Sequence, residues 1–79
     1  MIGENIKYYR LKRYLSQADL AKKIGCTQKS ISLYESNKVE PKTEMIKKIA
    51  YVLDVSWTRL LMNTTHKESD DENKNDIDK

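Results

Sequence analysis

The sequence predicts an all-α fold, and three observations support this prediction. Apolar residues recur at steps of three and four, the spacing that places side chains on one face of a helix. Alternation of apolar and polar residues never extends beyond a few positions, and no Asn-Gly or Asp-Gly pair is present to close a β-hairpin. Glycine occurs only at positions 3 and 25 and proline only at 41, so few points force a helix to end.

The first helix is predicted for residues 3–14. Its inward face is expected to hold Ile2, Ile6, Tyr9 and Arg10. A second helix is predicted for residues 17–24, with an inner stripe of Leu20, Ala21 and Ile24.

The boundaries of the second helix are marked by two local signals. Ser16 is expected to cap the start, with its hydroxyl on the N-H of Asp19 and the Asp19 carboxylate reaching back in a capping box. Gly25 can end the helix in the left-handed conformation without a Cβ penalty.

The third helix must begin almost at once, because only Gly25 and Cys26 precede Thr27, the next candidate N-cap. It is predicted for residues 28–36 and is expected to leave the second helix at a steep angle. Its inward residues are Ile31, Tyr34 and Glu35, and Asn37 is a plausible left-handed stop.

Pro41 separates the third helix from a fourth one, which Thr43 is expected to cap and which extends to Leu53. The fourth helix has a continuous apolar stripe consisting of Met45, Ile46, Ile49, Ala50 and Leu53. Ser56 is expected to cap a last helix, residues 57–62, with Trp57, Leu60 and Leu61 as its apolar side chains.

The composition divides the 79 residues into one small domain, residues 1–66, and an acidic tail, residues 67–79. The domain holds 12 Lys/Arg and 6 Asp/Glu, and the tail holds 3 Lys/Arg and 6 Asp/Glu. A basic domain suits a partner that carries phosphates, although solubility explains the charge equally well. The tail has one apolar residue, Ile77, so we expect it to be disordered.

Two short helices joined by a tight turn that contains glycine form the helix-turn-helix arrangement, whose second helix enters the DNA major groove. Any tight helix pair shares this pattern. The outward residues of the third helix add support, since Gln28 can pair with adenine, Lys29 with guanine, and Leu33 can contact a thymine methyl. A polar solvated face is the alternative.

The sequence resembles the lambdoid phage repressor and Cro class, also called the XRE type of helix-turn-helix, from Ile2 to Leu61. The resemblance rests on the run LSQADLAKKIGCTQKSISLYES, on Arg10 and Pro41, and on the closing AYVLDVSWTRLL. It implies a compact five-helix bundle that binds the two half-sites of a palindromic operator as a dimer. Three residues depart from the pattern, each where a glycine is frequent: Tyr14, Asn37 and Asp54.

The resemblance also implies residue roles. Base-reading residues would be Gln28, Lys29, Ser32 and Leu33. Phosphate-binding residues would be Gln17, Thr27, Asn37, Lys38 and Lys42. A buried structural ion pair would join Arg10 to Glu35. Trp57, Leu61 and Met62 either pack within the monomer or form a dimer contact.

We therefore expect a transcription regulator, a repressor that occludes a promoter through sequence-specific binding of double-stranded DNA. An antitoxin or controller protein, whose main partner is another protein, is the alternative. The tail is interpreted as a solvated end, or else as a segment that competes with DNA or recruits that partner.

An enzyme is not expected, because His66 stands alone and no nucleophile has an evident base. The single cysteine, Cys26, forms no internal disulfide and builds no metal site, so we expect no cofactor. No signal peptide or membrane segment is evident, which favours a cytoplasmic protein.

Overall fold

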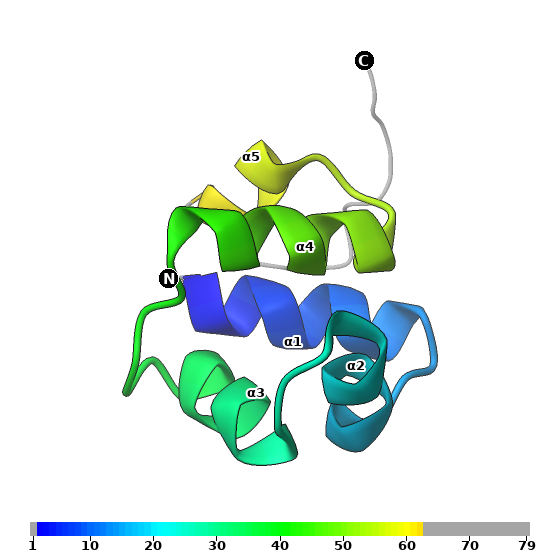
Figure 1. Ribbon diagram of the computed structural model, residues 1–79. Coiled ribbons are helices and arrows are strands. Elements are labelled where there is room, and N and C mark those ends of the chain that lie inside the picture. The colour runs from blue at the N-terminus through cyan, green and yellow to red at the C-terminus, as the bar shows by residue number, and fades with distance from the viewer. Residues whose placement is uncertain (1, 63–79) are drawn as a thin grey trace.

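The computed structural model describes residues 2–62, which form five α-helices and, within that range, no strand (Figure 1). The helices are α1 (Ile2–Lys12), α2 (Gln17–Ile24), α3 (Gln28–Glu35), α4 (Thr43–Leu53) and α5 (Trp57–Leu61). The prediction of an all-α fold is confirmed. The expected disorder of residues 67–79 and the domain boundary at residue 66 concern positions outside the described residues.

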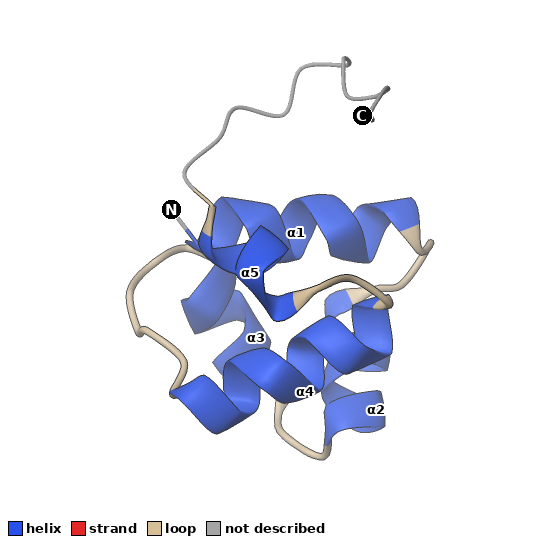
Figure 2. Ribbon diagram, turned by 90° about the horizontal axis from the view of Figure 1, so that it is seen from above, coloured by secondary structure: helices blue, strands red, loops and turns tan. Residues whose placement is uncertain are grey.

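The helices are arranged so that α2 and α3 lie at the end of the molecule opposite to α5 (Figure 1). Helices α1 and α4 lie between these ends (Figure 1), and the view from above shows α5 between α1 and α4 (Figure 2). None of the helices within residues 2–62 is long and apolar enough to cross a membrane.

The hydrophobic core draws on every helix. Its buried apolar residues are Ile6, Leu20, Ala21, Ile31, Ile46, Ile49, Ala50, Leu53 and Leu60. Full burial of one large aliphatic side chain contributes about 1.5–3 kcal/mol. The bundle is held together by the sum of these contributions, to which all five helices add. Leu60 is the one buried residue of α5, so the short last helix is held through a single apolar anchor.

The expected capping signals around α2 are present. Ser16 and Asp19 form a capping box, and Gly25 adopts the left-handed conformation at φ 91°. Asn37 and Asp54 are also left-handed, at φ 62° and φ 60°, as their tolerance of that region allows.

Helix α1 begins at Ile2 rather than Gly3, and three helix ends were also wrong by one or two residues. Helix α1 ends at Lys12 rather than Tyr14, because Tyr14 is left-handed at φ 58° and the N-H of Leu15 returns to the carbonyl of Arg10. Helix α3 ends at Glu35 rather than Ser36, and α5 ends at Leu61 rather than Met62, because the next residue in each case takes the C-cap position.

The start of α4 also corrects an expectation. Thr43 is the first helical residue and not the cap, because the carbonyl of Lys42 already accepts the N-H of Ile46 at 2.9 Å. Lys42 therefore occupies the N-cap position, with no side-chain hydrogen bond to the helix.

Two polar side chains, one in α1 and one directly after it, hold the C-terminal ends of α5 and α4, and the sequence did not reveal either one. Asn5 of α1 is buried, and its Nδ2 donates to the carbonyls of Leu60 and Met62 at 2.7 Å each. Arg13, which follows α1, donates from its Nε to the carbonyl of Leu53 at 2.7 Å. These bonds satisfy carbonyls that a helix end leaves without an internal partner, so α1 and the turn after it fix the positions of both later helices.

Candidate nucleic-acid interface

The turn between α2 and α3 is set by hydrogen bonds at its first two residues. The N-H groups of Gly25 and Cys26 both donate to the carbonyl of Ala21, at 2.8 and 3.0 Å. Thr27 follows in an extended conformation, so α3 begins directly after the turn. Ala21 and Ile31 are buried, and α2 and α3 therefore form one closely packed unit.

The outer face of α3 is polar. Gln28, Lys29 and Ser32 are exposed, whereas Ile31 and Glu35 are buried on the opposite face. Leu33 is half-buried, so it lies at the edge of the outer face rather than at its centre. The structure thus brings the three polar members of the expected base-reading set together on exposed surface.

The N-terminal ends of α2 and α3 offer backbone donors. Thr27 accepts the N-H of Ser30 at 3.1 Å, and Ser16 accepts the N-H of Asp19 at 2.9 Å. Among the described residues, the first two N-H groups of α2, at Gln17 and Ala18, and of α3, at Gln28 and Lys29, have no hydrogen-bond partner. Such groups, at the positive end of the helix dipole, are suited to bind an anion such as phosphate.

The carboxylate of Glu35 joins three helices. Arg10 Nε donates to Oε2 at 2.6 Å, and Arg10 Nη2 donates to Oε1 at 3.1 Å. Gln17 Nε2 also donates to Oε1, at 3.0 Å. The Arg10 and Glu35 side chains are only 8% and 4% exposed, so this is a buried ion pair with a third partner from α2.

Gln17, expected at a phosphate, therefore has a structural partner as well. An amide nitrogen carries two hydrogens, and one of them is used on Glu35. The second hydrogen, together with the backbone N-H of Gln17, would be the groups available to an anion at the start of α2.

The loop after α3 is held by its backbone and exposes two lysines. Asn37 Oδ1 accepts the N-H of Gly3 at 3.0 Å, and the N-H of Lys38 donates to the carbonyl of Leu33 at 3.0 Å. Lys38 and Lys42 are exposed, and neither forms an ion pair with another described residue. The only side-chain donor that Asn37 could offer an anion is Nδ2, and the Asn37 side chain also hydrogen-bonds Glu4.

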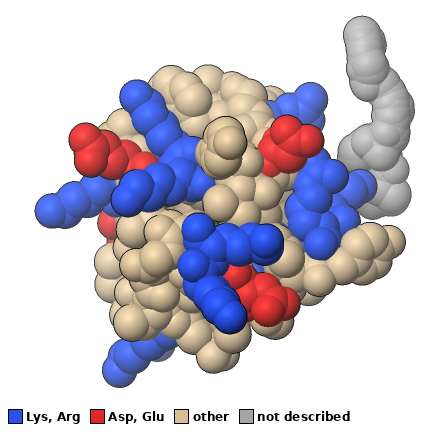
Figure 3. All heavy atoms as spheres, turned by 45° about the vertical axis from the view of Figure 1, so that its right-hand side comes forward, with Lys and Arg blue, Asp and Glu red and all other residues tan. Residues whose placement is uncertain are grey.

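Basic side chains are spread over the side of the molecule where α2 lies, with fewer acidic ones between them (Figure 3). Such a surface favours association with a polyanion, because binding releases its condensed counterions.

The thiol of Cys26 has no comparable role, since burial raises its pKa and keeps it protonated. Among residues 2–62, no cluster of His, Cys, Asp and Glu is suited to hold a metal ion.

The outer side of α5 is apolar. Trp57, Leu61 and Met62 are 43%, 47% and 48% exposed, so none of them belongs to the core of the monomer. Lys47 of α4 places its Nζ 5.9 Å from the centre of the Trp57 ring. These three residues define the α5 surface, which lies at the end of the molecule opposite to α3 (Figure 1).

Comparison with known proteins gives a consistent result. A family model described as helix-turn-helix matches residues 6–60. The chain is 37% identical over 71 residues to the HTH-type transcriptional regulator SinR of Bacillus licheniformis, and the match covers 89% of this chain and 64% of that relative. The chain therefore spans somewhat less than two thirds of the relative's length.

Two solved structures are similar as well. A crystal structure of SinR, described as a master regulator for biofilm formation, in complex with DNA superposes with a TM-score of 0.75 at 38% identity, covering 78% of this chain and 100% of that one. A SinR/SinI protein complex gives a TM-score of 0.76 at 36% identity, covering 90% of this chain and 69% of that one.

Proposed function

The chain belongs to the XRE-type helix-turn-helix family, and from this membership we propose that it is a transcription regulator that binds double-stranded DNA. The observation that carries the proposal is the outer face of α3, where Gln28, Lys29 and Ser32 are exposed beside free helix N-termini. The similarity to SinR in complex with DNA supports the same use of this surface.

Sequence would be read by α3 in the major groove. The carboxamide of Gln28 can make a bidentate contact with adenine, and the ammonium group of Lys29 can donate to guanine. Ser32 can contact either kind of base, and the half-buried Leu33 would reach a thymine methyl only from the edge of the face.

Phosphates would fix the register of the protein on the duplex without reading its sequence. At the start of α2 the contact would come from Gln17, and at the start of α3 from Thr27 and the free N-H groups beside it. On the other side of α3, Asn37, Lys38 and Lys42 would hold a second segment of backbone.

We further propose that the protein acts as a dimeric repressor at a palindromic operator. Two copies related by a two-fold axis would contact each other through the α5 surface, defined by Trp57, Leu61 and Met62. To bind both half-sites of such an operator, the dimer would need its two α3 helices about 34–36 Å apart, one turn of DNA. Occlusion of a promoter needs no enzymatic step and no cofactor.

Selection of bound sequences from a random duplex pool tests this proposal, with the molecular mass in solution recorded alongside. Enrichment of an inverted repeat with half-sites one helical turn apart is the expected result. Salt-sensitive binding without any enriched motif would overturn it, because that behaviour indicates phosphate contacts alone.

A protein partner is the second candidate function, that of an antitoxin or controller. The exposed α5 surface favours it, and so does the similarity to SinR in the SinR/SinI complex. The two roles differ in which substitution matters: loss of Gln28 would weaken operator binding and leave partner binding intact, whereas loss of Trp57 would abolish partner binding.

A further inference from the structure

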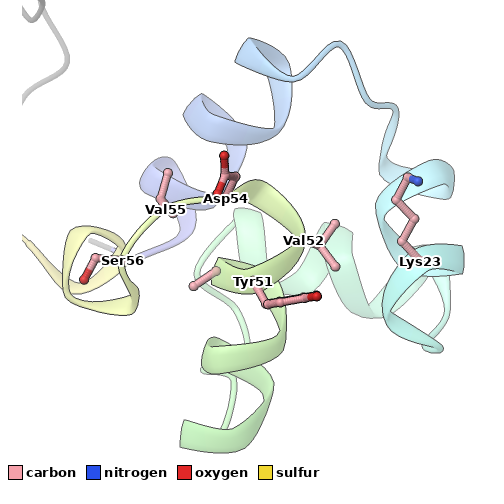
Figure 4. A pocket seen from close by; sticks show the side chains of 7 residues that line it. Lys23, Tyr51, Val52, Asp54, Val55 and Ser56 are labelled. Atoms are coloured by element: carbon pink, nitrogen blue, oxygen red, sulfur yellow. The ribbon is translucent and has the colours of Figure 1, made fainter.

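A groove of about 340 Å³ lies between α2 and α4, away from the outer face of α3. We call it the α2–α4 groove, and it is lined by Lys23, Ile24, Lys47, Lys48, Tyr51 and Val52. Tyr51 and Val52 project from α4 on the side that faces Lys23 of α2 (Figure 4). These three residues also line a second, neighbouring pocket, which is the one drawn in Figure 4. The groove therefore has an apolar floor with a lysine on the α2 side and two on the α4 side.

The charge of this groove is only partly balanced by the folded residues. Lys23 and Lys48 form no ion pair within residues 2–62, although Lys23 adds to the Ser16 hydrogen bonds that lower the pKa of Asp19. Lys47 contacts the ring of Trp57. No acidic residue lines the groove. Tyr51 is 87% exposed and lines the groove together with Ile24 and Val52, so apolar surface is open beside the three lysines.

A ligand for this groove would combine one apolar side chain with flanking carboxylates. The chain contains such a segment in Asp76, Ile77 and Asp78, and Ile77 is the single apolar residue of the tail. Residues 68–78 hold six Asp/Glu and one Lys, a net charge of −5. We propose that residues 76–78 dock on the α2–α4 groove of their own chain, with Ile77 on the apolar floor and the carboxylates of Asp76 and Asp78 at the lysines.

The length of the intervening chain permits this contact. Fifteen peptide units separate Met62 from Ile77, and at ~3.3 Å per residue they span about 50 Å when extended. The folded body measures 35 × 21 × 19 Å, so the extended segment is longer than the longest dimension of the body. Tethering of this kind supplies a millimolar effective concentration, which makes a weak contact sufficient for docking.

Docking at this site would reduce the positive charge of the domain without covering α3. The long-range attraction between the domain and a polyanion would then weaken, while the base-reading face stayed open. This mechanism differs from direct competition for the DNA-binding face, in which the segment would cover Gln28 and Lys29.

Nuclear magnetic resonance of the full chain tests the proposal, with the signals of Ile24, Tyr51 and Val52 as reporters of the groove. Ile77→Ser should move all three groups of signals, and the paired change Asp76→Asn with Asp78→Asn should move them in the same direction. The matched control is Asp70→Asn with Asp71→Asn, which removes the same charge elsewhere in the tail and should leave the groove signals in place.

The groove side has its own variant. Tyr51→Ser changes an exposed side chain, so the fold should persist, and it should abolish the response of the remaining groove signals to Ile77→Ser. Raising the salt concentration from about 0.1 M to about 1 M shortens the screening length from about 10 Å to about 3 Å and should mimic the tail variants.

Three outcomes would overturn the proposal. Groove signals that do not respond to Ile77→Ser would show that the segment does not occupy the groove. An equal response to the control pair would show a general charge effect. A response that disappears on dilution would assign the groove to the tail of a second copy.

Discussion

Gln17 Nε2 and Glu35 Oε1 are joined by a hydrogen bond of 3.0 Å, which ties the start of α2 to the end of α3. The same carboxylate oxygen accepts Arg10 Nη2 at 3.1 Å. Gln17, which is expected to contact phosphate, is thus held by the buried ion pair of Arg10 and Glu35. This ion pair fixes α1 against α3. Stability of the bundle and geometry of the candidate DNA-binding face therefore depend on one carboxylate.

Glu35→Ala should lower the free energy of unfolding by about 3–5 kcal/mol, because it leaves the Arg10 guanidinium buried without its partner. Urea denaturation measures this change. The control is the double variant Arg10→Met with Glu35→Leu, which removes both charges and should recover much of the loss. A double variant no more stable than Glu35→Ala would argue against an unpaired charge as the cause.

Gln28→Ala should lower affinity for the selected operator by about 1–3 kcal/mol and relax the preference at one base pair. The reason is that its carboxamide is proposed to read a base edge, and its exposed position makes a loss of stability small. Titration of operator and random duplexes in parallel measures the effect. Equal losses on both duplexes would contradict a reading role.

Lys38→Ala should weaken binding to every duplex and reduce the salt slope by about one, because one phosphate contact is lost. The measurement is the affinity as a function of salt concentration. Lys7→Ala is a matched control, since Lys7 is an exposed lysine on α1, outside the proposed contact set. Identical slopes for the two variants would remove Lys38 from the interface.

Gly3→Ala and Gly25→Ala should both destabilise the protein, for different reasons. A Cβ at Gly3 would lie within 3 Å of the carbonyl oxygens of Tyr34 and Glu35, so α1 would have to move away from α3. At Gly25 a Cβ meets nothing within 4 Å, and the cost is the left-handed backbone, about 1–2 kcal/mol. Thermal unfolding should rank Gly3→Ala as the less stable variant, and the reverse order would contradict this account.

Acid should weaken the cap of α2. Hydrogen bonds from the backbone N-H and then the side chain of Ser16 lower the pKa of Asp19 in the folded state. A group with a lowered folded pKa stabilises the protein above its unfolded pKa, about 3.9, and this contribution is lost as the pH falls through the folded value.

Unfolding midpoints between about pH 5 and pH 3 test this expectation for the wild-type chain and for Asp19→Asn, which has no charge to lose. The stability difference between the two should shrink as the pH falls. A difference that stays constant over this range would show that the charge of Asp19 does not contribute.

Local signals in the sequence were sufficient for the helices and for half of their ends. The capping box of Ser16 and Asp19 and the left-handed Gly25, Asn37 and Asp54 are each decided within four residues of chain. The left-handed Tyr14 was not predicted, because a bulky side chain rarely adopts that conformation. The glycine that is frequent at its position in the resembling family was the signal that could have revealed it.

What the sequence by itself determined is therefore the all-α class, the order of five helices and the tight turn before α3. Only the tertiary structure decided that Asn5 and Arg13 hold the ends of α5 and α4, that Gly3 permits the contact between α1 and α3, and that the α5 surface stays exposed. The physical reason is separation along the chain. A cap or a helical stripe is written in neighbouring residues, whereas the partner of Asn5 lies 55 residues away and is defined only when the helices pack.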